Sequence, residues 1–111
     1  MQFSKEMIKG VAEIIVLQTL HDQGEAYGYQ LTRALAKTSN NIFELQEGTL
    51  YPLLYRLEFK GLVTSSIQPA PSGKERRYYK ITLKGKKLLQ DRSMELSTLL
   101  RGIKQVLHLQ I

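Results

Sequence analysis

The chain has 111 residues, of which 42% are hydrophobic, and this is typical of one small domain with a single core. It has no cysteine, which excludes disulfides and thiolate metal sites, and its two histidines lie far apart and at no metal-ligand spacing. The N-terminal segment lacks a signal-peptide pattern, and the longest strictly apolar run covers only residues 14–17. We therefore expect a cytoplasmic protein without a membrane span, a metal or a cofactor.

The positive charge is concentrated in one segment. The net charge is +6, and residues 72–87 alone contain seven basic residues and one acidic residue, so the rest of the chain is neutral. A cationic strip beside a neutral body favours a polyanionic partner such as nucleic acid. A solvated loop that only keeps the protein soluble is the alternative.

Three helices are predicted in the N-terminal half. Apolar residues at helical spacing predict the first over residues 5–23, and Gly24 offers a stop. The second is expected over residues 27–38, followed by a connector at 42–45 that could form a short strand. The third is expected to begin near Thr49, with a proline in its first turn. The local order is therefore helix, turn, helix.

The periodicity changes after the third helix. Residues 62–68 and 76–82 are rich in β-branched and aromatic residues and predict two strands, joined by a turn-forming segment at 69–73. Helical periodicity returns over residues 82–108, with apolar positions close to a heptad seam. A helix this long has nowhere in a small monomer to bury its stripe, so we expect it to pack against a second subunit. The expected seam residues are Leu89, Leu96, Leu100, Ile103 and Leu107.

Together these elements predict a mainly α protein with a small β-hairpin. The order is that of a winged helix-turn-helix followed by a long C-terminal dimerisation helix. We expect the winged helix-turn-helix DNA-binding domain to occupy residues 1–82 and the dimerisation helix to occupy residues 83–111.

A DNA-binding surface follows from the faces that such a fold leaves exposed. The third helix should enter the major groove, and the basic hairpin should follow the phosphate backbone or the minor groove. Alternation along a strand puts Arg76 and Arg77 on opposite faces, so only one is expected to contact DNA, and the other could pair with an acid. For the tyrosines, packing against the hairpin is the alternative. The expected DNA-binding residues are Tyr29, Thr49, Tyr51, Arg56, Lys60, Ser72, Gly73, Lys74, Arg76 and Arg77.

No catalytic arrangement is recognisable in the sequence. The serine-rich segment 64–66 has no histidine near it, and the glycines form neither a phosphate loop nor a dinucleotide-binding motif. We therefore expect a regulator and not an enzyme. A winged-helix adaptor that binds a protein partner and no DNA is the alternative function, although such an adaptor would not need a basic wing.

Four separated segments resemble the PadR family of transcriptional regulators. The most specific is residues 47–58, which contain Thr-Leu-Tyr-Pro from Thr49 onward, and it is followed by Gly-Leu-Val at residues 61–63. Tyr-Gly-Tyr at residues 27–29 and Arg-Arg-Tyr-Tyr from Arg76 onward stand in the order that the family would have. The resemblance therefore covers nearly the whole chain.

The resemblance implies a bacterial, homodimeric repressor that binds an inverted-repeat operator in double-stranded DNA and is released by a small molecule or stress signal. The single C-terminal helix is similar to the compact branch of the family, in which multidrug sensors stack planar drugs between tryptophans. This chain contains no tryptophan, which argues against that mode of binding. An aromatic or apolar effector could instead lie between the first and last helices, against Ile8, Ala12, Met94 or Leu100.

Overall fold

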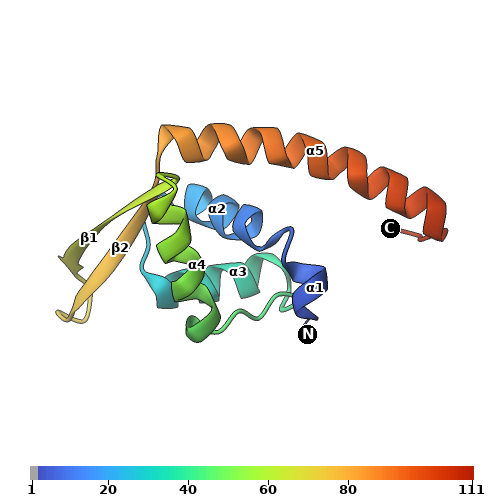
Figure 1. Ribbon diagram of the computed structural model, residues 1–111. Helices are drawn as coiled ribbons and strands as arrows, with labels where there is room; N and C mark the ends of the chain where they lie inside the picture. Colours follow the sequence, from blue (N-terminus) through green and yellow to red (C-terminus); the bar gives the residue numbers. More distant parts are fainter. Residues whose placement is uncertain (1–2) are drawn as a thin grey trace.

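The computed structural model describes residues 3–111, which form five helices and one two-stranded antiparallel sheet (Figure 1). Helices α2, α3 and α4 form a compact body, the hairpin projects from one side, and α5 crosses the body and extends past it on the other. The predicted fold class is confirmed. The elements are α1 (Lys5–Ile8), α2 (Ala12–Gln23), α3 (Gly28–Thr38), α4 (Glu47–Phe59), β1 (Val63–Pro69), β2 (Glu75–Ile81) and α5 (Leu83–Leu107).

The core is built from the apolar stripes of the helices and the root of the hairpin. Leu20, Leu54 and Leu57 are each 0% exposed, and side chains from α2, α3, α4, both strands and α5 join them in one cluster. Each such buried leucine contributes about 1.5–3 kcal/mol to folding through removal of apolar surface from water. This core fixes the direction of α4 relative to the hairpin.

The hairpin is anchored at its root and open at its tip. Its register pairs Val63 with Ile81 at the root and Pro69 with Glu75 near the tip. The root is tied to the segment before α3, because the backbone amides of Ala26 and Tyr79 each donate to the other's carbonyl, at 3.1 and 2.8 Å. The wing therefore has a fixed base beside the start of α3 and an exposed end.

Helix α5 starts as part of the core. The Thr82 hydroxyl caps it by accepting from the amide of Gly85 at 3.0 Å, and it donates to the carbonyl of Gly61 at 2.7 Å. Gly85 and Leu89 are buried in the first two turns. Leu89, one of the expected seam residues, is only 6% exposed and belongs to the core cluster of its own chain, so little of this side chain is left to meet a partner.

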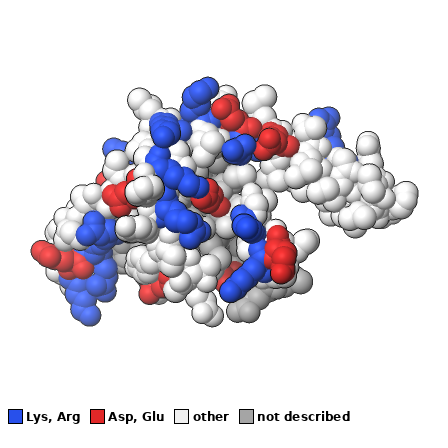
Figure 2. All heavy atoms as spheres, in the orientation of Figure 1, with Lys and Arg blue, Asp and Glu red and all other residues white. Residues whose placement is uncertain are grey.

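The distal half of α5 lies beyond the body and carries apolar side chains into solvent. Leu100 is 46% exposed and Ile103 is 37% exposed, whereas Leu96 is half-buried. In Figure 2 this end of the helix is almost free of charged groups on the face shown. Other exposed apolar residues there are Leu99, Val106, Leu107, Leu109 and Ile111.

Three boundaries differ from the prediction. The expected first helix is divided into α1 and α2, because Gly10 weakens the helix there and α1 has no buried residue to compensate. Helix α4 begins at Glu47, so Pro52 lies within it and not in its first turn, and Gly48, four residues before the proline, is exposed. The connector at residues 42–45 forms no strand.

Candidate nucleic-acid interface

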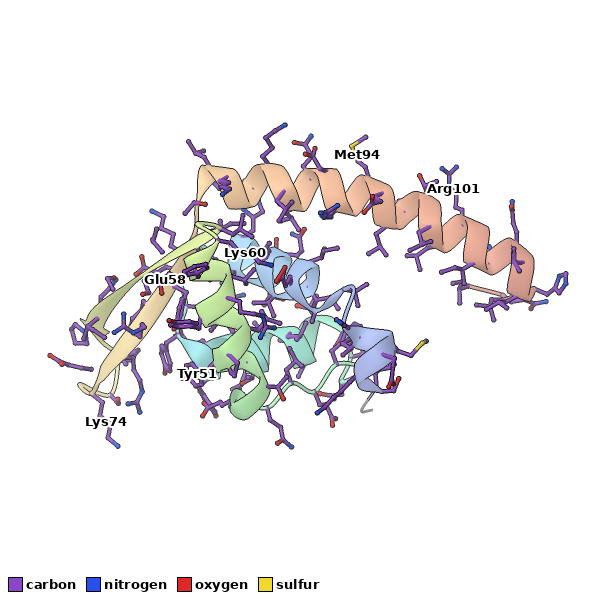
Figure 3. All side chains as sticks on the ribbon, viewed as in Figure 1. Tyr51, Glu58, Lys60, Lys74, Met94 and Arg101 are labelled. Atoms are coloured by element: carbon purple, nitrogen blue, oxygen red, sulfur yellow. The ribbon has the colours of Figure 1, made fainter. Side chains whose placement is uncertain are left out.

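A concave surface of three tyrosines, one acid and one base lies where α3, α4 and the hairpin meet. It is lined by Tyr27, Tyr29, Glu47, Tyr51 and Arg76. We call this surface the tyrosine concavity. The N-terminal half of α4, with Tyr51, and the hairpin tip, with Lys74, lie at the same end of the molecule in Figure 3. The concavity forms a continuous surface between them, because its lining includes Glu47 at the start of α4 and Arg76, two residues from Lys74 at the tip of the wing.

Tyr51 is held by close contact with the first residue of α3. A Cβ atom added at Gly28 would lie 2.5 Å from the Tyr51 hydroxyl, so the ring occupies the space that a side chain there would need. Partial burial and the nearby Glu47 carboxylate raise the pKa of Tyr51, and Arg76 opposes them. Tyr51 therefore stays protonated at neutral pH and can donate or accept a hydrogen bond.

Arg76 and Arg77 have different surroundings. The Arg76 guanidinium lies 6.0 Å from the centre of the Tyr27 ring and lines the tyrosine concavity. Arg77 donates to the Ser65 hydroxyl at 3.0 Å, and Ser65 in turn donates to the Glu58 carboxylate at 2.8 Å. Arg77 is thus linked through a serine to an acid of α4, whereas Arg76 faces the concavity.

The hairpin tip is a tight, exposed loop. The Ala70 amide donates to the Lys74 carbonyl at 2.8 Å, and the Gly73 amide donates to the Ala70 carbonyl at 2.8 Å. Gly73 has a φ of +90°, a backbone conformation that residues with a side chain rarely adopt. This conformation closes a three-residue hairpin loop. Ser72, Gly73 and Lys74 are all exposed, as an element that follows a DNA backbone requires.

The remaining expected residues of α4 lie on the side of that helix away from the concavity. Thr49, Arg56 and Lys60 share one stripe by helical spacing, and all three are exposed. Lys60 forms an ion pair with Glu13 of α2 at 2.8 Å, so its ammonium group is already engaged. The structure therefore gathers Tyr29, Tyr51 and Arg76 but separates this stripe from them.

The comparisons with known proteins bear on what such a surface does. A family model described as the transcriptional regulator PadR-like family matches residues 16–91, which include α3, α4 and the hairpin. The chain belongs to the PadR-like family of transcriptional regulators. The resemblance found in the sequence is thus confirmed, and the family consists of regulators and not of enzymes.

Individual relatives agree with this assignment. A transcriptional regulator of Mycobacterium tuberculosis is 31% identical over 99 residues, which are 89% of this chain and 88% of that protein. A transcriptional regulator from Clostridium thermocellum has a solved structure that matches with a TM-score of 0.80 at 28% identity, over 90% of this chain and 96% of that one. A PadR family transcriptional regulator from Eggerthella lenta matches with a TM-score of 0.78 at 32% identity, over 95% and 88% of the two chains.

Two groups of residues at the interface of this PadR-like chain were not predicted from the sequence. Tyr27 and Glu47 both line the tyrosine concavity: Tyr27 directly precedes α3, and Glu47 is the first residue of α4. On α3, Arg33 donates to the Tyr29 hydroxyl at 2.9 Å, which raises the pKa of Arg33, and Lys37 lies one turn further along. The spacing of four residues from Tyr29 to Arg33 to Lys37 was the available signal for this stripe.

The basic segment 72–87 is divided in space. Lys74 and Arg76 lie at the wing, whereas Lys84 donates to the Lys60 carbonyl at 2.9 Å, at the C-terminal end of α4, and Lys87 pairs with Asp91 at 3.8 Å on α5. Figure 2 shows basic side chains at the end of the hairpin and in a separate band across the middle of the molecule. Only part of the positive charge that is adjacent in sequence therefore lies beside the start of α4.

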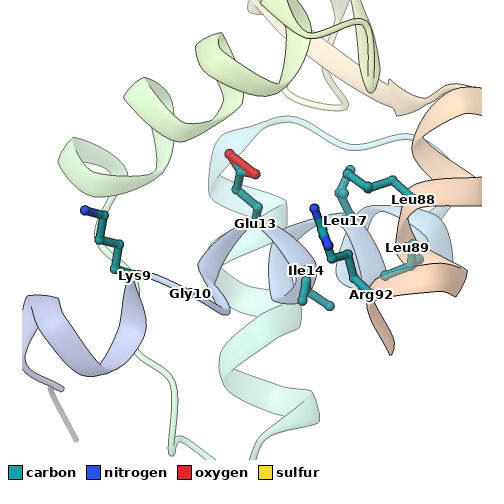
Figure 4. Close-up of a pocket in the computed structure, with 8 residues that line it drawn as sticks. All are labelled: Lys9, Gly10, Glu13, Ile14, Leu17, Leu88, Leu89 and Arg92. Atoms are coloured by element: carbon teal, nitrogen blue, oxygen red, sulfur yellow. The ribbon is translucent and has the colours of Figure 1, made fainter. Parts of the chain in front are cut away.

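The expected effector residues do not come together. Ile8 lies on α1, Ala12 is packed against the core, Met94 points away from the body in Figure 3, and Leu100 is exposed on the distal half of α5. A small cavity of about 70 Å³ does lie between α2 and α5, where Ile14 and Leu17 face Leu88 and Leu89 (Figure 4). A larger pocket of about 270 Å³ lies beside α1, lined by Phe3, Lys5, Ile8, Phe43, Glu44, Leu45, Gln46 and Thr49.

None of the helices in the described residues combines the length and the apolar character needed to cross a membrane.

Proposed function

We propose that this PadR-like regulator is a repressor that binds an inverted-repeat operator as a homodimer and is released by a small molecule. The observation that carries the proposal is the continuous surface from the tyrosine concavity to the wing tip. It presents the first turns of α4, whose exposed side chains suit a major groove, beside an exposed cationic loop that suits the adjoining backbone.

Arg76 is the arginine of the wing that we assign to DNA. It lines the concavity beside Tyr51, and its guanidinium has no acidic partner among the described residues. Arg77 would have to leave Ser65, and with it the link to Glu58, before it reached a phosphate. Lys74 at the tip and Arg33 and Lys37 on α3 supply further positive charge at the edges of the surface.

A gel-shift titration of the wild-type protein with DNA from upstream of its own gene, at two salt concentrations, tests DNA binding. Specific binding should weaken steeply with salt, because each phosphate contact that is lost contributes about 0.9 to the log–log slope. Arg76→Ala should reduce both the affinity and the slope, whereas Arg77→Ala, the matched control one residue away, should have a smaller effect. Equal effects of the two substitutions would contradict the assignment of Arg76.

Dimerisation is proposed for the distal half of α5. Leu96, Leu100, Ile103 and Leu107 follow the spacing of a heptad seam, and a second copy of the same helix is the partner whose stripe complements it. Leu100→Asp should give monomers in sedimentation equilibrium at micromolar concentration. Leu83→Asp makes the same change at an exposed position at the start of α5 and should leave the dimer intact. A wild-type monomer would refute the proposal.

The pocket beside α1 is the proposed site for an apolar or aromatic effector. Its volume of about 270 Å³ approaches the lower end of known ligand pockets, and the rings of Phe3 and Phe43 meet at a centroid distance of 5.3 Å beside it. It borders Thr49, so an occupant would press on the first turn of α4. Phe43→Ala should abolish any rise in Tm caused by an aromatic inducer without loss of operator binding.

An adaptor that binds a protein and no DNA remains the second candidate function. Only the exposed apolar side chains of α5 favour this function, and neither the tyrosine concavity nor the wing supports it. If Lys74→Ala combined with Arg76→Ala left regulation in cells unchanged, the adaptor would replace the repressor as the better account.

A further inference from the structure

Glu47 is out of place on a surface that binds a polyanion. It is the one carboxylate among the residues that line the tyrosine concavity, and it is exposed at the first position of α4. Its carboxylate forms no hydrogen bond or ion pair with another described residue. Next to DNA phosphates this charge is unfavourable, so its presence calls for a specific partner on the DNA.

The major groove offers such a partner. Among the four bases, cytosine presents an exocyclic amino group without an adjacent acceptor, and a carboxylate accepts a hydrogen bond from that N4 group. Guanine presents two acceptors in the same groove, which a carboxylate would repel. A residue at the beginning of a recognition helix is also the one that reaches base edges most directly.

We propose that Glu47 reads one cytosine in each operator half-site, an inference that rests on the DNA-binding function proposed above. Tyr51 and Arg76 line the concavity beside this carboxylate. The tyrosine lies one helical turn along α4, and the arginine supplies positive charge from the wing. The arginine attracts the backbone while the carboxylate selects the base. Glu47 thus adds specificity at the expense of general affinity for DNA.

The opposing explanation is that Glu47 only stabilises α4. A negative charge in the first turn interacts favourably with the helix dipole, and this effect needs no DNA. The two explanations differ for Glu47→Gln, which keeps the shape of the side chain and removes its charge. A glutamine pairs with the N6 and N7 atoms of adenine, so reading by this position should change from cytosine to adenine.

Selection from a pool of randomised duplex DNA, followed by sequencing, provides the test. The wild-type protein should enrich a two-fold symmetric motif with cytosine preferred about fivefold to tenfold at one position of each half-site. With Glu47→Gln this position alone should change to adenine or lose its preference. Glu75→Gln removes another exposed carboxylate, at the start of β2, and should keep the wild-type motif.

The outcomes separate this inference from the function on which it rests. If the wild-type protein enriches no motif, the DNA-binding function itself fails, and the role of Glu47 fails with it. If the wild-type motif appears and Glu47→Gln leaves every position unchanged, only the role of Glu47 is overturned. A motif altered equally by Glu75→Gln would also overturn it, because the effect would then come from charge alone.

Discussion

Gly85 is the position where a single methyl group should do most damage to the fold. A Cβ atom there would run into the backbone carbonyl oxygen of Leu62 and lie 2.8 Å from Cγ1 of Ile81. That carbonyl accepts from the Thr82 amide at 3.0 Å and so joins the end of the wing to the start of α5. A backbone atom cannot swing aside as a flexible side chain can, so the segment must shift as a unit.

The expected magnitude follows from opposing terms. Alanine is favoured over glycine within a helix by about 1 kcal/mol. Overpacking of a tight site costs about 1–3 kcal/mol, and disturbing the Leu62 hydrogen bond adds about 1 kcal/mol. Gly85→Ala should therefore lower the free energy of unfolding by about 2 kcal/mol, which corresponds to roughly 10 °C in Tm for a domain of this size.

Thermal and urea denaturation of purified protein without DNA measure this effect, with Gly48→Ala as the control. Gly48 is also helical, but an added Cβ there meets no atom within 4 Å, so Tm should stay the same or rise slightly. Similar changes in Tm for the two variants would refute the conclusion that α5 packs closely against Leu62 and Ile81 at Gly85.

Three further predictions concern the concavity, the α2–α4 ion pair and the hairpin. Gly28→Ala displaces the phenol of Tyr51, which can move into solvent, so operator affinity in a gel shift should fall by more than Tm does. Lys60→Ala should lower stability in urea by only about 0.2–1 kcal/mol, as should Glu13→Ala, because their ion pair is partly exposed. Burial raises the pKa of Tyr79 above its ordinary value of 10.0, so the protonated form stabilises the fold at neutral pH and this contribution is lost as the pH rises past about 10. Tyr79→Phe should accordingly lose less stability than the wild type between about pH 9 and 11 in a urea titration.

The sequence was sufficient for the order and type of the long elements. Periodicity identified α3, α4, both strands and α5, because each buries one face against the same core. It was insufficient at Gly10, where the helix ends for lack of tertiary contacts, and at Leu89, whose heptad position is the same whether it packs on its own chain or on a partner. Spacing along a helix states which residues share a face but not what covers that face.

The site was predictable in part for a related reason. Tyr51, Arg76 and Lys74 were expected because they belong to segments with a helix-turn-helix or wing pattern. Glu47 was not predicted, because a DNA-binding surface is expected to carry basic residues and this one is acidic. The division of the basic segment could not be foreseen either, since the turn from β2 into α5 carries its second half to the opposite end of α4.

Helix α5 links the proposed seam to the DNA-binding surface without a hinge. Gly85 and Leu89 in its first two turns are buried against the winged-helix core, and its 25 residues continue for about 37 Å as one helix. In a dimer held by the distal seam, the crossing angle of the two α5 helices would therefore set the distance between the two copies of α4. Successive major-groove half-sites lie about 34 Å apart, so a change in that angle alters which operator spacing both copies can reach. Any change in this crossing angle would therefore release DNA while both winged helices keep their folded structure.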